Sequence, residues 1–470
     1  MAAYTAVPPL PKHVAFTYYK RARKAVLQAI DKPSLQTVQA FYFINLFAQW
    51  NGQPSIGRPF FKSALDMLLL LQLDIDPDDS PWLYPLKLTD RQKEERRRVF
   101  WCCYWFLTLE QATTSDAVQI QLSTNRIRPP RPIEGVFKGF ILQTCESQSL
   151  IAEIRRHHSK APKSLVDILG SESIITLNSR LIQVHQQFPA EYLLIAENAE
   201  NLSTLDYSRF LGQLSSILKT DVAYICTLNL NILASVCMLH RPKLYLSAVK
   251  HLDPEKLNDE ARVLISSALS HSIDSAHRAL CLLGFYLDVM EGSARERLPV
   301  DQRLYFSSQI VLTQLNVYPI FEVMIVFWFF VCRTRPCWRR YSAVGISNVP
   351  LLLERLVGLV SFVKRVFAAE KNTPGTMEPI LKCMEAMVAE MSNLVAGQGA
   401  TEFSSNNDVA DLELGMKVMA LGEQEEDSAV PIITQEPCAF LGLLGMEVAG
   451  GIRWKGRSEE AWRLFWKLNS

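Results

Sequence analysis

The stretch LKTDVAYICTLNLNILASVCMLHRP, at residues 218–242, decides the fold class of this sequence. Its apolar positions recur at spacings of three and four residues: Leu218, Val222, Ile225, Leu228, Ile232 and Val236. Such spacing places them on one face of a long α-helix. Pro242 is expected to stop this helix directly after His240 and Arg241, because proline has no backbone N–H to donate.

Helical signals of the same kind extend over most of the chain. Ser34 is a candidate N-cap for a helix that Asn51 and Gly52 close, and another helix begins near Thr89. Strand signals are sparse, since no sustained apolar alternation is bounded by hairpin dipeptides. The sequence therefore predicts an all-α body of many helices.

The composition limits the classes of protein that this chain can belong to. Of its 470 residues 49% are hydrophobic and 21% are charged, which excludes a wholly disordered chain. Lysine and arginine number 49 against 48 acidic residues, so no overall field attracts phosphate and any nucleic-acid contact needs a local patch. The ten dispersed cysteines form no CxxC pair and are expected in the core of an intracellular protein.

The ends of the chain and its most apolar segment give further expectations. No signal peptide is visible at the N-terminus. Residues 310–332 are predicted to form a buried core helix rather than a membrane span, because polar residues and Pro319 shorten the apolar run.

The predicted domain organisation has four parts. Residues 1–14 form a flexible N-terminus and residues 15–396 a helical domain. Residues 397–437 form a disordered segment, in which 401–437 hold nine acidic residues and one basic residue, Lys417. This acidic segment is interpreted as a linker or, alternatively, as an activation segment. Residues 438–470 form a C-terminal helical segment.

Motifs for catalysis and metal binding are not found in the sequence. The cysteines and histidines lack the spacings of a zinc site, and no phosphate-binding glycine loop or nucleophile elbow occurs. The acidic run Asp74, Asp76, Asp78 and Asp79 lacks the glycine and glutamate of a calcium loop and is expected to be a solvated turn. The sequence therefore predicts a non-enzymatic protein with no catalytic, metal or cofactor-binding residues.

The sequence ERRRVFWCCY, at residues 95–104, contains the most conspicuous basic cluster. Glu94 and Glu95 precede Arg96, Arg97 and Arg98, and an aromatic run follows them. Arginines in this setting are expected to cover the start of a helix and to pair with carboxylates rather than with phosphate.

This stretch resembles the central motif of the fungal-specific transcription factor domain, the regulatory "middle homology" region of zinc-cluster transcription factors such as the xylanolytic activators. Further segments agree in order and spacing: 18–23 (YYKRAR), 33–40 (PSLQTVQA), 64–73 (ALDMLLLLQL), 239–242 (LHRP) and 275–279 (SAHRA). The resemblance covers about residues 18–340. It implies structural or regulatory roles for Arg96, Arg97, Arg98, Phe100, Trp101, Tyr104, His240, Arg241 and Pro242.

Some positions depart from the family pattern. Leu107 stands where the family has an acidic residue, and Gln72 stands where it has a helix-ending glycine. The six closely spaced cysteines of a zinc cluster do not occur, so zinc is expected only if a zinc-cluster segment precedes this chain.

The resemblance implies a nuclear protein that regulates DNA-templated transcription. It would act through the transcriptional machinery or other regulators, through a homodimer or through a small-molecule effector, and would contact DNA only indirectly. No membrane association is expected. The alternative is a non-catalytic helical scaffold or adaptor without a transcriptional role.

Overall fold

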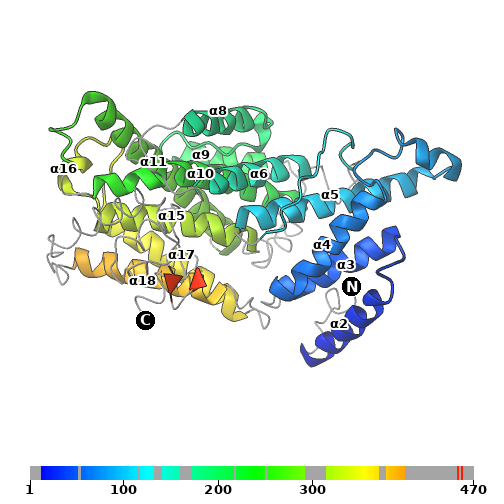
Figure 1. The fold of residues 1–470 in the computed structure, drawn as a ribbon. Helices are drawn as coiled ribbons and strands as arrows, with labels where there is room; N and C mark the ends of the chain where they lie inside the picture. The colour runs from blue at the N-terminus through cyan, green and yellow to red at the C-terminus, as the bar shows by residue number, and fades with distance from the viewer. Residues whose placement is uncertain are drawn as a thin grey trace, which may run out of the picture. The chain divides into compact units, whose positions relative to one another are not determined.

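The computed structural model describes residues 12–50, 54–113, 117–131, 140–158, 172–215, 219–248, 252–291, 314–369 and 377–396, with short pieces at 453–454 and 457–458. Helices make up almost all of these ranges (Figure 1), and the predicted all-α class is confirmed. The only strands in them are β1 (Arg453–Trp454) and β2 (Arg457–Ser458), which pair antiparallel. The predicted acidic segment, 397–437, and the C-terminal helix expected after Ser458 lie outside the described residues.

The helices fall into two compact units. Unit 1 comprises residues 1–149 and 367–378, and unit 2 comprises residues 150–366 and 379–470. The elements of the first part of the chain are α2 (Lys12–Leu27), α3 (Leu35–Trp50), α4 (Pro54–Leu70), the 3₁₀ helix η1 (Pro81–Leu86), α5 (Asp90–Thr113) and α6 (Ile141–His158). The remaining helical elements are α8 (Glu172–Gln186), η2 (Ala190–Tyr192), α9 (Thr204–Ser215), α10 (Lys219–Leu244), η3 (Tyr245–Ser247), α11 (Asp259–Glu291), α15 (Gln314–Cys332), α16 (Pro336–Arg339), α17 (Val349–Ala369) and α18 (Met377–Val395).

The helix boundaries of unit 1 follow from local hydrogen bonds. The Thr37 N–H donates to Ser34 Oγ at 3.1 Å, which confirms the predicted N-cap of α3. At the start of α5, the Gln92 N–H donates to Thr89 Oγ1 at 3.3 Å and the Thr89 N–H donates to Gln92 Oε1 at 2.9 Å. This reciprocal pair is a capping box, and it fixes where α5 begins.

The turn after α4 is left-handed at Gln72, a residue other than glycine. Gln72 has φ 51°, and the Leu73 N–H donates to the Leu68 carbonyl at 3.0 Å. This is the αL ending that glycine adopts most readily. Gln72 therefore makes this turn at the expense of backbone strain.

The core of unit 1 joins α3, α4 and α5 around large aromatic side chains. Phe41, Phe61, Phe100 and Trp101 are at most 1% exposed. α4 approaches α3 closely at Gly57, where a Cβ atom would lie only 2.6 Å from Asn45 Oδ1 and 3.0 Å from the Ala48 Cβ. Glycine is therefore required at this point of contact.

The core of unit 2 is formed by α10, α11 and α15, which pack on one another. The residues of α15 from Val323 to Phe329 are at most 1% exposed, so the predicted buried helix is confirmed. Among the described residues, none of the helices combines the length and the apolar character that crossing a membrane would need. Among the described cysteines, Cys103, Cys145, Cys226, Cys237 and Cys281 are free and buried, as expected of core residues. The expectation is wrong for Cys102, which is exposed, and Cys332 and Cys337 are only partly buried.

Candidate functional site

The arginines of the ERRRVFWCCY motif begin α5, and Arg97 enters a buried ion-pair network. Its Nε donates to Asp76 Oδ2 at 2.9 Å and its Nη2 to Asp76 Oδ1 at 2.7 Å. Nη2 also lies 2.7 Å from Asp78 Oδ2, while the Arg128 N–H donates to Asp76 Oδ2 at 3.1 Å. We call Asp76, Asp78, Arg97 and Arg128 the Asp76 cluster.

Burial and hydrogen bonding act in opposite directions on Asp76. Its side chain is 1% exposed and that of Arg97 is 4% exposed. Burial by itself would raise the pKa of Asp76, but hydrogen bonds from Arg97 and from the backbone of Asp78 and Arg128 outweigh it and lower the pKa. The carboxylate therefore stays charged inside unit 1, and the charge is held by a bidentate arginine.

The expected solvated turn is wrong for Asp76. The acidic run does follow α4, but Asp76 is fully buried because Arg97 comes from α5 to meet it. The pairing with carboxylates is confirmed for Arg97 and Arg98 but not for Arg96, which donates to the Leu71 carbonyl. Asp76 is the closer partner of Arg97: Asp76 Oδ1 lies 2.7 Å from Arg97 Nη2, whereas Glu94 Oε2 lies 3.6 Å from Arg97 Nη1.

The other motif residues of α5 secure neighbouring segments. Arg96 Nη2 donates to the Leu71 carbonyl at 2.9 Å, and Arg98 Nη2 donates to the Arg131 carbonyl at 2.6 Å. Trp101 Nε1 donates to the Arg128 carbonyl at 2.8 Å. Phe100 is fully buried and stacks on Tyr104 at a centroid distance of 5.9 Å. These side chains support the fold, and their donors face protein carbonyls rather than an open phosphate site.

The second group of motif residues lies at the end of α10 in unit 2. The expectation that Pro242 stops the helix is wrong, because α10 continues to Leu244 with Pro242 inside it. A proline leaves the carbonyl four residues earlier, here that of Met238, without its helical donor. The His158 imidazole hydrogen-bonds to the Met238 backbone and so replaces the missing partner.

His240 and Arg241 are both held by neighbouring helices. The His240 ring stacks on His271 of α11 at a centroid distance of 5.0 Å and an interplanar angle of 24°. The Arg241 guanidinium donates to the Glu322 carboxylate of α15, and both residues are buried. The structure thus divides the predicted motif residues between unit 1 and unit 2.

The buried imidazoles make the stability of the chain depend on pH. Burial, with the nearby His157 and Arg241, lowers the pKa of His158 to about 3. Burial, with His271 and Lys243, lowers the pKa of His240 to about 3 as well. An unfolded histidine has a pKa of about 6.5. Below that value the unfolded chain binds protons that the folded chain does not, so stability is lost as the pH falls from about 6.5 toward about 3.

We therefore expect the free energy of unfolding to fall by about 2 kcal/mol for each of His158 and His240 between pH 7 and pH 5. Urea unfolding followed by circular dichroism measures this loss. His240→Phe keeps an aromatic ring that cannot bind a proton, so its free energy of unfolding should depend less steeply on pH than that of the wild type. His13→Gln, at an exposed histidine of α2, is the matched control and should leave it unchanged. If the free energy of unfolding of His240→Phe fell with pH as steeply as that of the wild type, the lowered pKa of His240 would be contradicted.

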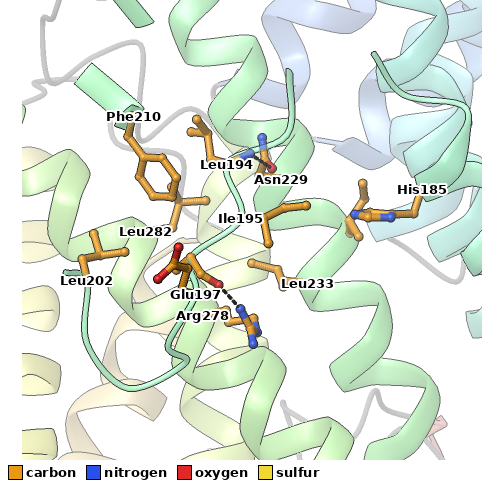
Figure 2. Close-up of a pocket in the computed structure, with 12 residues that line it drawn as sticks. His185, Leu194, Ile195, Glu197, Leu202, Phe210, Asn229, Leu233, Arg278 and Leu282 are labelled. Atoms are coloured by element: carbon orange, nitrogen blue, oxygen red, sulfur yellow. Dashed lines mark hydrogen bonds between the residues drawn. The ribbon is translucent and has the colours of Figure 1, made fainter. Parts of the chain in front are cut away.

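A cavity of about 460 Å³ lies within unit 2 (Figure 2). Its residues come from α8, α9, α10, α11 and the segment 193–203, which we call the pocket loop. The lining is His185, Leu194, Ile195, Ala196, Glu197, Leu202, Phe210, Asn229, Ile232, Leu233, Arg278 and Leu282. Most of these side chains are aliphatic or aromatic, as is usual for pockets that bind small molecules.

The pocket loop is held in place by polar side chains from its surroundings. Asn229 Oδ1 accepts a hydrogen bond from the Leu194 N–H at 2.9 Å, and its Nδ2 donates to the Tyr192 carbonyl at 2.7 Å. Arg278 donates to the Ala196 carbonyl and, through Nε, to Asp274 Oδ2 at 2.8 Å. The cavity therefore has one wall of irregular backbone whose position is fixed by two helices.

The far end of the pocket loop is fastened at Glu200. The Ser347 N–H donates to Glu200 Oε1 at 3.1 Å, and Arg355 Nη1 of α17 donates to the Glu200 carbonyl at 2.7 Å. His277 Nε2 lies 3.7 Å from Glu200 Oε1. Glu200 thus connects the pocket loop with α11, with α17 and with the segment before α17.

The cavity was not identified from the sequence, because its residues come from separate helices and are mostly apolar. One signal pointed to it. The segment 275–279 (SAHRA), already singled out as a motif, contains His277 and Arg278, and these two residues hold the pocket loop. Among the described residues, no group of three or more His, Cys, Asp and Glu is arranged to hold a metal ion.

Comparison with known proteins gives one result for this chain. Residues 4–191 match the family model described as the fungal specific transcription factor domain. No curated protein and no solved structure matches the chain. The matched segment includes the Asp76 cluster and the whole aromatic motif of α5, whereas the cavity lies mainly beyond it. Residues 4–191 are thus similar to the fungal specific transcription factor domain.

Proposed function

We propose that this chain regulates DNA-templated transcription in the nucleus of a fungal cell, as the regulatory body of a zinc-cluster-type transcription factor. The observation that carries the proposal is the family match over residues 4–191. The chain would act through other regulators or the transcriptional machinery, through self-association, or through a small-molecule effector, with DNA contacted only indirectly.

The chemistry of the motif residues supports a regulatory role. The motif arginines and aromatics of α5 contact protein groups and build the fold, and they present no nucleophile or acid–base pair. A helical body with a packed core and a cavity has the parts that a sensing or docking domain needs. We likewise propose that the chain has no enzymatic activity.

A tethering experiment tests the proposal directly. Fusion of the full chain to a heterologous DNA-binding domain should change the output of a reporter gene at least about fivefold, in either direction. The unfused DNA-binding domain is the first control. Arg97→Met, which breaks the Asp76 cluster, should abolish the effect, while Arg98→Met at a partly exposed neighbour should retain it.

An unchanged reporter, with the wild-type fusion folded and present in the nucleus, would overturn the proposal and favour a scaffold or adaptor. A second variant lacking residues 401–437 separates the two interpretations of the acidic segment. Loss of reporter activation in this variant supports an activation segment, and unchanged output supports a linker.

A further inference from the structure

The outer face of α2 carries a group of cations that we call the cation stripe: Lys20, Arg21 and Lys24. All three side chains are exposed. The opposite face of α2 packs on α3 (Figure 1), with Tyr19 and Val26 at most 8% exposed. Because successive residues of a helix are turned by about 100°, the three cations lie together on the side directly away from this buried face.

The cation stripe differs from other cations of the chain in having no carboxylate partner. Within the described residues, none of its three side chains has a hydrogen bond or an ion pair. Several cations elsewhere are paired with carboxylates at 2.7–3.0 Å: Lys93–Asp78, Arg98–Glu94 and Lys364–Glu385. Lys20 and Lys24 are four residues apart on one helix, where like charges repel and destabilise the helix. A negatively charged partner would relieve this repulsion.

The sequence around α2 supplies little negative charge of its own. Residues 1–65 contain eight lysines and arginines but one acidic residue, Asp31. The helix on which α2 packs, α3, has no charged residue. The near-neutral chain therefore has a local excess of positive charge, which attracts anionic groups over a distance of about 10 Å at ordinary salt.

Exposed apolar side chains border the cation stripe. Tyr18, one turn from Arg21, is 48% exposed, and Leu27, two turns from Lys20, is 53% exposed. Ile30, in the turn after α2, is 51% exposed. Large apolar groups that are exposed together beside polar residues mark sites of protein interaction.

Three kinds of anionic partner differ in how well they match this face. A nucleic-acid backbone matches the cations but leaves Leu27 and Ile30 uncovered. A membrane surface takes up helices whose apolar residues lie at the centre of the bound face, whereas cations occupy the centre of this one. An acidic protein segment with interspersed apolar residues matches both the charge and the apolar borders.

We propose that the cation stripe, with Tyr18 and Leu27 at its borders, is a docking surface for an acidic amphipathic segment of a partner protein. Carboxylates of that segment pair with Lys20, Arg21 and Lys24, and its aliphatic side chains cover Leu27. The part that this contact plays in transcription rests on the proposed function, whereas the binding itself does not.

Fluorescence anisotropy with the purified full chain tests the proposal. The probe is a fluorescein-labelled peptide in which Asp and Glu are interspersed with Leu and Met. One matched peptide has Asn and Gln in place of the acidic residues, and a second has Ser in place of Leu and Met. Each should bind at least about fivefold more weakly than the acidic peptide. A DNA duplex and vesicles of phosphatidylserine should also bind more weakly.

Variants locate the binding surface on α2. Replacement of all three cations of the stripe by glutamine should weaken binding of the acidic peptide at least about tenfold. Lys87→Gln/Arg91→Gln/Lys256→Gln removes the same charge at exposed positions outside α2, and this matched control should bind as the wild type does. Leu27→Ser should weaken binding about threefold. Circular dichroism melting of each variant shows that it is folded.

Equal binding by the stripe variant and its matched control would overturn the proposal, as would tighter binding of the DNA duplex or the vesicles than of the peptide. Tighter peptide binding by the variant lacking residues 401–437 would show that the chain's own acidic segment occupies the surface, and would overturn a separate partner.

These results are independent of the reporter experiment. Peptide binding with an inactive reporter removes the transcriptional function and leaves the docking surface, and an active reporter without peptide binding does the reverse.

Discussion

Replacing Arg97 with methionine should lower the free energy of unfolding by about 3–5 kcal/mol, because it leaves the buried Asp76 carboxylate without its bidentate partner. The remaining positive side chain is a poor substitute. Arg128 Nε is 3.9 Å from Asp76 Oδ2, and the Arg128 side chain is 58% exposed. Two backbone N–H groups, of Asp78 and Arg128, still donate to the carboxylate, but they carry no formal charge.

Urea unfolding of the wild type and Arg97→Met gives this difference. Arg98→Met is the matched control, since Arg98 pairs with Glu94 at 3.0 Å with 32% of its side chain exposed. It should cost about 1 kcal/mol or less. The double variant Arg97→Met/Asp76→Leu removes both charges and should regain much of the loss. An Arg97→Met variant as stable as Arg98→Met would show that the cluster is not a buried support.

The ion pair between α10 and α15 gives the second large effect. Glu322 is 1% exposed and Arg241 is 7% exposed. Glu322→Gln keeps the shape of the side chain but leaves the Arg241 guanidinium charged in the core of unit 2. We expect a loss of about 3–5 kcal/mol in the free energy of unfolding, because the burial of an unpaired charge is costly.

Differential scanning calorimetry and urea unfolding both measure this loss. Arg241→Met/Glu322→Leu should be more stable than Glu322→Gln, because apolar side chains of similar size need no charge compensation. Asp288→Asn, at a partly buried carboxylate of α11, is a control for the removal of a charge from unit 2. It should cost clearly less than Glu322→Gln. The interpretation would be contradicted by a double variant less stable than Glu322→Gln.

Local features of the fold could be predicted from the sequence, because they depend on residues a few positions apart. The N-cap Ser34, the beginning of α5 after Thr89 and the buried helix α15 are of this kind. The partner of Arg97 could not be predicted in this way. Asp76 is 21 residues away in the sequence, whereas two other candidate carboxylates, Glu94 and Glu95, are much nearer to Arg97. Only the packing of α4 and the turn after it against α5 decides which carboxylate is buried.

Pro242 shows why a local rule can fail at a tertiary contact. The rule that proline ends a helix assumes that the freed carbonyl has no other donor. In this chain His158 of α6 supplies one to the Met238 backbone, so α10 continues to Leu244. The cavity could not be predicted either, because its mostly apolar lining is contributed by four helices and a loop, and only Arg278 of that lining belongs to one of the quoted family motifs.

The contact at Gly57 has a consequence for substitutions at Asn45. Asn45 is fully buried, and among the described residues its side-chain oxygen and nitrogen have no hydrogen-bond partner. Loss of that amide would forfeit no hydrogen bond and would open room beside position 57. The Ala48 Cβ and the Asn45 backbone oxygen, at 3.0 Å and 3.1 Å from a Cβ at position 57, would still restrict that position. Room for a side chain at 57 therefore needs both the loss of the Asn45 amide and a shift between α3 and α4.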